Sequence, residues 1–296
     1  MSVLEALNGY IQQTGQSQNA IAKAMGISAA ALSQYIKNKY PGNLEVLETK
    51  IAQFLNLSYE REDYPAAEIG YIDTSVSLSI MDTARNCHVG RRIGIVTGES
   101  GLGKTTAAKH YAEINPDVLI VFGRPSITTK SILTEIARKV GVDPTGCVDD
   151  VFLRIVARLK DSGRLLIIDE AEHLTARVLD QIRRLNDPEF AGIGLLLIGL
   201  PKLLHTLKNS QNDHKYIYSR VGWNTSVRTL TDNDCEQFVG RALPGSGSLW
   251  KIFADCSRRN ARAICNLIER SIEVAAFNGC PVDAELIKKT AQLLIS

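Results

Sequence analysis

A glycine-rich segment that ends in lysine and threonine contains the residue types best suited to chemistry in this sequence. The segment and the residue after it are Gly98, Glu99, Ser100, Gly101, Leu102, Gly103, Lys104, Thr105 and Thr106. Its glycines allow the backbone to curl around a phosphate chain with the N–H groups pointing inward. The lysine can reach the β- and γ-phosphates, and the first threonine hydroxyl group can bind Mg²⁺. The spacing therefore predicts a site for a nucleoside triphosphate and Mg²⁺.

Two adjacent acidic residues follow an apolar run downstream of this loop. The run spans residues 165–168, and Asp169 and Glu170 come directly after it. Asp169 is suited to hold Mg²⁺ together with Thr105, and Glu170 to polarise a water molecule for attack on the γ-phosphate. Acidic residues at a strand end are often only solvated, but the phosphate loop upstream favours the catalytic interpretation. The combination predicts a nucleoside triphosphatase.

Short apolar segments alternate with helical patterns around these motifs. The predicted strands are 93–97, 118–122, 165–169, 193–198 and 224–228, and the predicted helices between them are 104–114, 130–140, 148–160, 176–185 and 202–209. Runs of Val, Ile and Leu without alternating polar residues are typical of strands that are covered on both faces. Residues 71–230 are therefore predicted to form an α/β domain, a P-loop NTPase core with a parallel sheet.

Both ends of the chain are predicted to be helical. Apolar residues recur at helical spacing through residues 1–60, and further helices are predicted at 232–242, 248–256, 261–277 and 283–295. Thr231 and Asp283 have the residue type and position of helix N-caps. Residues 61–70 are charged, contain a proline and lack apolar periodicity. The predicted organisation is a helical domain (1–60), a linker (61–70), the α/β core (71–230) and a helical lid domain (231–296).

The first helical domain contains a pattern typical of a helix-turn-helix. Small Ala22 lies in the first helix and Gly26 at the turn, and apolar residues follow at the spacing of a core. The second helix, about 28–38, would present polar residues outward: Ser28, Ser33, Gln34 and Lys37. Gln34 could read a base edge, and Ser33 and Lys37 are better suited to phosphates. Glutamates balance the lysines of this domain, so a helical protein-docking module is the alternative.

Basic residues of the α/β core form a second candidate DNA surface. Arg124 and Lys130 follow the second predicted strand, and Arg183 and Arg184 lie after the acidic pair. Such contacts, repeated from several copies, could grip a DNA backbone without reading its sequence. The alternative is that these side chains are only solvated.

Composition and charge restrict the remaining possibilities. The formal net charge of the 296 residues is only +2, so DNA affinity must come from local patches or from several copies. The six cysteines lack metal-binding spacing and are predicted to be reduced thiols. The N-terminus has no signal pattern, and no apolar run approaches the roughly 20 residues of a membrane span. A cytoplasmic protein without a membrane partner is therefore expected.

Two further arginines complete a resemblance to the AAA+ ATPases. Arg220 follows Ser219 just before the last predicted strand, and Arg262 lies in the predicted lid after Asn260 and Ala261. The resemblance implies that Arg220 is a finger supplied to the γ-phosphate of a neighbouring subunit, and that Arg262 contacts the nucleotide of its own chain. It also implies ATP and Mg²⁺ as cofactors, catalytic roles for Lys104 and Glu170, and self-assembly for hydrolysis. A surface ion pair is the alternative for each arginine.

One position departs from the pattern of these ATPases. At the end of the predicted strand 193–198 the family usually has a polar residue that helps to place the attacking water. This chain has Leu200 there. The substitution predicts hydrolysis that is slow or depends on a partner.

The order of these parts is similar to that of the Mu-type transposition protein B family, the target-DNA activators of replicative transposition. This resemblance covers nearly the whole chain. It implies a protein that binds double-stranded DNA with little sequence preference, polymerises on it with ATP as a helical filament, and delivers it to a transposase. It also implies that the transposase stimulates ATP hydrolysis. The expected location of the protein is the cytoplasm of a bacterium or of a phage-infected host. Two alternatives stay open, a helicase-loader or replication-initiator ATPase and an ATP-switched transcription regulator.

Overall fold

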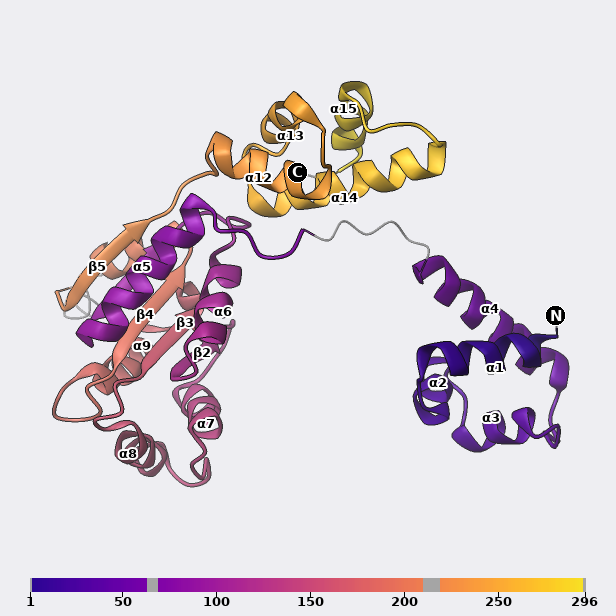
Figure 1. Ribbon diagram of the computed structural model, residues 1–296. Coiled ribbons are helices and arrows are strands. Elements are labelled where there is room, and N and C mark those ends of the chain that lie inside the picture. Colours follow the sequence, from indigo (N-terminus) through magenta and orange to yellow (C-terminus); the bar gives the residue numbers. More distant parts are fainter. Residues whose placement is uncertain (1, 63–68, 210–218, 295–296) are drawn as a thin grey trace. The chain divides into compact units, whose positions relative to one another are not determined.

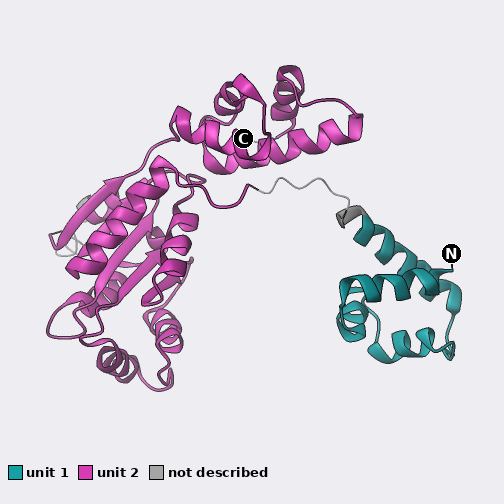
Figure 2. Cartoon of the chain, viewed as in Figure 1, with its two compact units in different colours: residues 1–66 teal, residues 67–296 magenta. Residues whose placement is uncertain are grey.

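The computed structural model describes residues 2–62, 69–209 and 219–294. The chain divides into two compact units, residues 1–66 and residues 67–296 (Figure 2). Within the described ranges, no helix combines the length and the apolar character that a membrane crossing requires.

The first unit consists of short helices around one apolar core. They are α1 (Val3–Thr14), α2 (Gln18–Ala24), α3 (Ala29–Ile36) and α4 (Leu44–Glu62). Ser17 and Ser28 cap α2 and α3 by accepting hydrogen bonds from backbone N–H groups of the first turn. Gly26 takes a left-handed conformation (φ 65°) in the turn between these two helices, and Ala22 is buried against the core. The helical pair predicted from the sequence is therefore present.

The second unit contains a sheet of five parallel strands in the order β2-β3-β4-β1-β5. The strands are β1 (Ile93–Thr97), β2 (Val118–Phe122), β3 (Leu165–Asp169), β4 (Gly194–Gly199) and β5 (Val221–Ser226). The predicted parallel sheet is confirmed, and β1, β2 and β3 have the predicted bounds. β5 lies three residues before the predicted start, because it is an edge strand with mostly exposed side chains and no apolar run marks it.

Helices cover both faces of this sheet (Figure 1). One face packs against α5 (Ser75–Gly90) and α6 (Lys104–Ile114), and the other against α7 (Thr129–Val140), α8 (Val148–Leu159), α9 (Ala176–Arg183) and α10 (Pro201–Asn209). Alternate strand residues supply the two cores, as Ile95 and Val96 illustrate. Helix α5 was not predicted, because its serines, threonines and β-branched residues are weak helix formers. A capping box at Thr74 and the buried residues Val76, Ile80 and Cys87 stabilise it.

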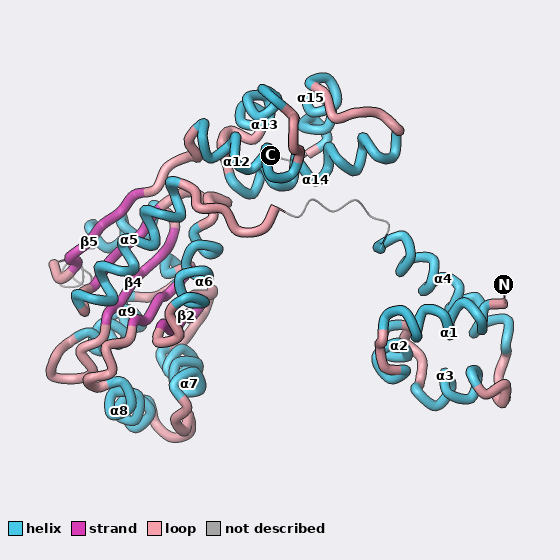
Figure 3. The backbone as a smooth tube through the Cα atoms, viewed as in Figure 1, coloured by secondary structure: helices cyan, strands magenta, loops and turns pink. Residues whose placement is uncertain are grey.

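The C-terminal region is a group of helices packed on the same unit (Figure 3). It contains α12 (Asp232–Ala242), α13 (Trp250–Cys256), α14 (Ala261–Asn278) and α15 (Ala284–Leu293). Thr231 and Asp283 are the N-caps of α12 and α15, as predicted. The last predicted helix extends to residue 295, which lies outside the described residues, as do most of the predicted linker and the segment before Ser219.

The Asp234 clamp, formed by Asp234 with Ser75 and Thr231, attaches this region to the core. The Asp234 carboxylate accepts hydrogen bonds from the Ser75 N–H (2.8 Å), the Ser75 hydroxyl group (2.5 Å) and the Thr231 N–H (2.8 Å). Burial alone would raise the pKa of Asp234, but these hydrogen bonds outweigh it and hold the pKa below its usual range. Nearby, Arg241 Nη1 donates to the Tyr71 carbonyl oxygen at 2.6 Å. The segment that enters α5 is thus fixed to α12.

Candidate nucleotide-binding site

The phosphate loop connects β1 to α6 with the backbone geometry that its glycines permit. Gly101 (φ 79°) and Gly103 (φ 86°) are both left-handed, and Gly103 is the N-cap of α6. The first N–H groups of α6 therefore face the loop, where an anion is favoured by the helix dipole. A Cβ atom on Gly101 would lie 2.4 Å from Asn260 Oδ1, so a glycine is also needed for the approach of α14.

The functional side chains of the loop contact backbone and β3 atoms in this structure. Lys104 Nζ donates to the carbonyl oxygens of Gly98 and Glu99, both at 2.7 Å. Thr105 Oγ1 donates to Asp169 Oδ2 at 2.5 Å. Burial lowers the pKa of Lys104, although the carboxylates of Asp169 and other nearby acidic residues oppose this. The loop thus brings a cation and a hydroxyl group to the carboxyl end of β3, as the sequence predicted.

The two acidic residues after the apolar run differ in exposure and backbone conformation. Asp169 is 2% exposed, whereas Glu170 is exposed and left-handed (φ 54°, ψ 36°). A left-handed residue other than glycine costs about 1 kcal/mol or more and is frequent at functional sites. The strand β2 supports this turn, because the Gly123 N–H donates to the Asp169 carbonyl oxygen at 2.7 Å. A Cβ atom on Gly123 would lie 2.3 Å from the Glu170 carbonyl oxygen, so only glycine fits there.

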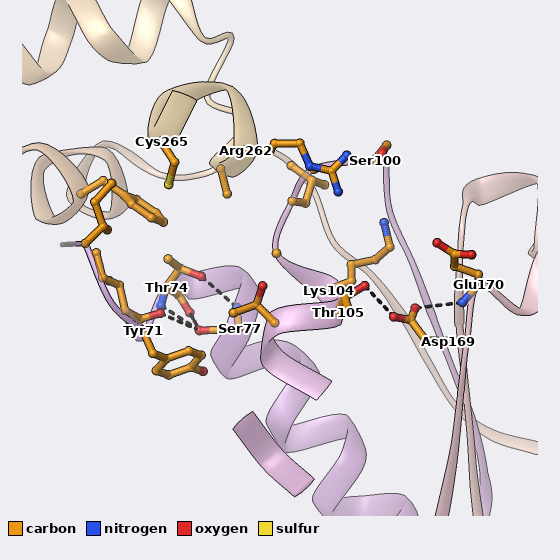
Figure 4. Close-up of a pocket in the computed structure, with 18 of the residues that line it drawn as sticks. Tyr71, Thr74, Ser77, Ser100, Lys104, Thr105, Asp169, Glu170, Arg262 and Cys265 are labelled. Carbon is orange, nitrogen blue, oxygen red and sulfur yellow. Dashed lines mark hydrogen bonds between the residues drawn. The ribbon is translucent and has the colours of Figure 1, made fainter. Parts of the chain in front are cut away.

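The start of α14 lies directly on the phosphate loop. The Asn260 amide group donates to the Ser100 carbonyl oxygen at 2.7 Å, and the Arg262 N–H donates to the Gly101 carbonyl oxygen at 2.9 Å. Arg262 lines the same cavity as Lys104 and Glu170, and Figure 4 shows the three side chains around one opening. The C-terminal helical region therefore closes over the loop and adds a second cation to it.

These elements enclose a cavity of about 620 Å³, a size that suits a nucleotide. Predicted residues that line it are Ser100, Gly101, Leu102, Gly103, Lys104, Thr105, Thr106, Asp169, Glu170 and Arg262. Gly98 and Glu99 line a neighbouring cavity of about 860 Å³ on the same loop and contribute the carbonyl groups that Lys104 contacts. The structure therefore brings the predicted nucleotide-binding residues together.

Several lining residues were not predicted from the sequence. They come from the entry and first turn of α5, the turn after β3 and the body of α14: Tyr71, Thr74, Ser77, Glu172, His173, Cys265 and Glu269. Glu172 Oε2 accepts a hydrogen bond from the Leu200 N–H at 3.2 Å, so at this position the main chain supplies the polar group. A Cβ atom on Gly199 would lie 2.5 Å from the same oxygen. No motif marks these residues, because they meet only through long-range packing.

The donor set fits a magnesium ion bound together with phosphates. Mg²⁺ prefers oxygen ligands and is usually held by one or two carboxylates plus substrate phosphates and water. Thr105 Oγ1 and the Asp169 carboxylate supply two such oxygen atoms side by side. Within the described part of the chain, no group of three or more His, Cys, Asp or Glu side chains could bind a metal by itself. The ion would therefore depend on the nucleotide.

Arg220 lies at the amino end of the parallel strands, whereas the phosphate loop lies at their carboxyl end. It directly precedes β5, whereas the loop follows the carboxyl end of β1, and these strands are parallel. The Arg220 guanidinium group forms an ion pair with Asp187. Strand β1 alone spans about 17 Å. Arg220 is therefore too far from the loop of its own chain to contact a nucleotide there.

Arg183 and Arg184 do not fit the prediction of free DNA contacts. The Arg183 side chain is 12% exposed and is held by Asp180 (3.2 Å) and by Asp187 (2.9 Å). The Arg184 guanidinium group lies over the rings of Phe152 and Phe190, 4.7 Å and 4.6 Å from their centroids. Both arginines are thus engaged in packing the core, which a sequence pattern could not show.

The other predicted DNA contacts have more accessible side chains. Arg124 is 61% exposed beside Glu135, and with the exposed Lys130 it lines a shallow depression at the start of α7. In the first unit, Gln34 and Lys37 are exposed, whereas Ser33 is half-buried and the Ser28 hydroxyl group is used as a helix cap. Gln34 and Lys37 are therefore the exposed side chains among these predicted contacts whose polar groups do not cap the helix.

Comparison with known proteins assigns the chain to a family. Residues 87–207 match the sequence model of an AAA domain. The Mu-like prophage FluMu DNA transposition protein B of Haemophilus influenzae is 32% identical over 245 residues, which cover 80% of this chain and 83% of that protein. The chain belongs to the Mu-type DNA transposition protein B family.

The match extends to other members of this family. The ATP-dependent target DNA activator B of Escherichia phage Mu is 28% identical over 218 residues, or 72% of this chain and 69% of that protein. The resemblance to the transposition protein B family that the sequence suggested is confirmed.

Solved structures support the fold. The ORC2 protein of Aeropyrum pernix aligns with a TM-score of 0.58 at 17% identity, covering 74% of this chain and 67% of its own. RuvB of Thermotoga maritima aligns with a TM-score of 0.51 at 18% identity, covering 74% and 68%. At these identities the likeness concerns the fold alone, and it confirms the predicted α/β AAA P-loop class.

Proposed function

We propose that this protein binds ATP with Mg²⁺, assembles in that state on double-stranded DNA, delivers the DNA to a transposase and activates strand transfer. One observation carries the proposal. Lys104, Thr105, Asp169 and Arg262 converge on one cavity in a chain that belongs to the transposition protein B family. The phage Mu relative is an ATP-dependent target DNA activator by name.

In this proposal the phosphate loop exchanges its internal contacts for the triphosphate. The Lys104 ammonium group leaves the carbonyl oxygens of Gly98 and Glu99 and binds the β- and γ-phosphates. Thr105 and Asp169 hold Mg²⁺, which supplies charge neutralisation of the phosphates. Glu170 orients and polarises the attacking water from its exposed position at the end of β3.

The apolar side chain at Leu200 supports slow hydrolysis. Leu200 contributes its backbone N–H to Glu172 in this part of the site, so no polar side chain from position 200 helps to hold the water. The rate of ATP hydrolysis should therefore depend on DNA and on the transposase, since a partner would have to complete the placement of the attacking water.

Contacts between the loop and α14 connect nucleotide binding to the lid. Arg262 would contact the phosphates of its own chain, and its N–H already binds the Gly101 carbonyl oxygen. A change in the loop on binding ATP therefore displaces the start of α14. The position of the C-terminal helices would then depend on which nucleotide is bound.

Arg220 supports the proposal of assembly. Because it lies at the amino ends of the strands, away from the loop at their carboxyl ends, it can stabilise a γ-phosphate only in a second copy of the chain. Contacts between opposite ends of identical subunits are heterologous, and they generate rings or helical filaments. ATP bound between copies would make assembly and DNA binding one process.

For DNA contacts we propose two separate surfaces with accessible side chains, Gln34 and Lys37 in the first unit and Arg124 and Lys130 in the second. Each copy offers few phosphate contacts, so affinity would arise from repetition along a filament. The guanidinium groups of Arg183 and Arg184 are engaged by carboxylates and aromatic rings of the same unit, and they are left out of these surfaces.

The test is DNA binding with ATP, with ADP and without nucleotide, followed by light scattering and electron microscopy. Lys104→Ala should abolish ATP-dependent assembly, whereas Arg220→Ala should retain nucleotide binding and lose polymerisation or turnover. Equal coverage of DNA without nucleotide would contradict the proposal. Footprinting distinguishes the alternatives, since one protected palindrome would indicate a transcription regulator and recruitment of a hexameric helicase would indicate a loader.

A further inference from the structure

Arg92, the residue before β1, lies against the first residues of the edge strand β5. A Cβ atom on Gly222 would lie 3.1 Å from Arg92 Cδ and 3.6 Å from Arg92 Cβ. The Arg92 side chain thus occupies the space that a larger residue at 222 would need. The pairing of β1 with β5 also shifts in register here, between Ile93 and Gly94. Such irregularities re-aim side chains and are frequent beside functional sites.

This placement brings Arg92 close to Arg220. Arg220 precedes Gly222 by two residues, so their Cα atoms are at most about 7 Å apart. Arg92 is exposed, and within the described part of the chain its side chain has no ion pair or hydrogen bond. Its backbone is fixed, because its carbonyl oxygen accepts a hydrogen bond from the Leu195 N–H at 3.1 Å.

Arg92 and Arg220 place two positive charges at the amino ends of the paired strands β1 and β5. Like charges at one end of a sheet favour the binding of an anion there. Asp187 compensates Arg220 only in part, because the same carboxylate also binds Arg183 at 2.9 Å and 3.0 Å. No carboxylate of the described residues pairs with Arg92. The amino ends of β1 and β5 therefore have a positive charge without a partner among the described residues, which is a property of anion-binding sites.

We propose that Arg92 acts with Arg220 as a second cation that binds the triphosphate held by the phosphate loop of another copy of this chain. The inference rests on the proposed ATP-dependent assembly and names a residue of that interface. The nucleotide of the same chain is out of reach, because β1 separates Arg92 from the loop by about 17 Å.

Charge complementarity favours a second copy as the source of the anion. A loaded cavity would carry the triphosphate next to the carboxylates of Asp169, Glu170 and Glu172. The amino ends of β1 and β5, at the other end of the strands from this cavity, present Arg92 and Arg220. Complementary charges at the two ends of the parallel strands of one subunit favour head-to-tail contacts between copies. The site at each nucleotide is then complete only in the assembly.

The experiment compares Arg92→Ala with Arg91→Ala in the full chain. Arg91 is the adjacent exposed arginine, and its guanidinium group lies toward Gly163, with Nη2 3.9 Å from a Cβ atom built there. The two variants therefore remove equal charge from neighbouring positions. Nucleotide binding is measured with a fluorescent ATP analogue on dilute protein, and assembly on DNA with ATP by light scattering.

Arg92→Ala should raise the protein concentration needed for half-maximal assembly by about tenfold or more, as the loss of a charge-assisted contact implies. Arg91→Ala should stay within about twofold, the scale of a surface substitution. Both should bind the analogue as the wild type does. Arg92→Lys should recover part of the assembly. Gly222→Val keeps every charge but displaces the Arg92 side chain, and it should impair assembly in the same direction.

Several outcomes would overturn the inference. Equal assembly by the Arg92→Ala and Arg91→Ala variants would remove Arg92 from the interface. Weaker binding of the analogue by dilute Arg92→Ala protein would indicate a role within one chain. An equal loss of DNA affinity with and without nucleotide would assign Arg92 to DNA phosphates. Failure of the wild type itself to assemble with ATP would instead contradict the proposed function.

Discussion

Replacing Asp234 by asparagine should loosen the attachment of the C-terminal helices to the core. Asp234 is 2% exposed and accepts hydrogen bonds from the Ser75 N–H, the Ser75 hydroxyl group and the Thr231 N–H. These bonds are divided between the two carboxylate oxygens, and asparagine replaces one of those oxygens by an NH₂ group, which cannot accept a hydrogen bond. At least one buried donor therefore loses its acceptor.

The magnitude follows from these contacts. A buried donor without an acceptor costs about 1–3 kcal/mol, and the loss of charge weakens the remaining hydrogen bonds by about 1 kcal/mol. We expect a total loss of about 3 kcal/mol, which for a unit of this size corresponds to a fall in Tm of roughly 6–12 °C. Affinity for nucleotide should also fall, because the clamp fixes the segment at Tyr71 and Thr74 that lines the cavity.

The matched control is Asp232→Asn in the same first turn of α12. The Asp232 side chain is 63% exposed and pairs with Arg259. An exposed ion pair contributes about 0–1 kcal/mol, so this variant should lose at most about 4 °C. Differential scanning calorimetry of both variants isolates the buried clamp. Equal Tm values for the two variants would refute the reasoning.

The effect should also depend on pH. The folded-state pKa of Asp234 is held below its unfolded value of about 3.9, so its stabilising contribution is fully present above that value. It is lost as the pH falls through the folded-state pKa. The Tm difference between wild type and Asp234→Asn should therefore be constant near neutral pH and shrink below about pH 4. A difference that persists unchanged in acid would show that the charge is not responsible.

Three other substitutions test the proposed roles. Glu170→Gln should keep nucleotide binding and lower the hydrolysis rate by about 100-fold or more, since the amide cannot act as a base; phosphate release measures this, and a wild-type rate would remove Glu170 from the chemistry. Arg183→Ala should lower the free energy of unfolding by about 3 kcal/mol, because Asp187 and Asp180 lose a buried partner. Arg124→Ala should instead weaken DNA binding and change stability by less than about 0.5 kcal/mol. Thermal unfolding and DNA titration of both arginine variants separate these effects, and a stable Arg183→Ala protein with impaired DNA binding would reverse the assignment.

Local patterns in the sequence determined the chemistry of the site and most of the sheet. The loop from Gly98 to Thr105 combines turn, phosphate binding and helix start in consecutive residues, so its position between β1 and α6 could be predicted. The buried strands are apolar on both faces, and the helix caps at Thr231 and Asp283 are short-range hydrogen bonds. Such features depend on neighbours in the chain, and a sequence records those directly.

Only the tertiary structure decided how distant residues meet. Tyr71, Glu172 and Cys265 line the cavity because three separate segments pack around the loop, and no spacing rule links them. Arg183 matched the pattern of a DNA contact, but in the fold its side chain is only 12% exposed and pairs with two carboxylates. The sequence gives Arg92 no role, and only the pairing of β1 with β5 places its side chain beside Gly222. Burial and charge pairing are properties of the packed chain, so they arise only when residues far apart in sequence are brought together.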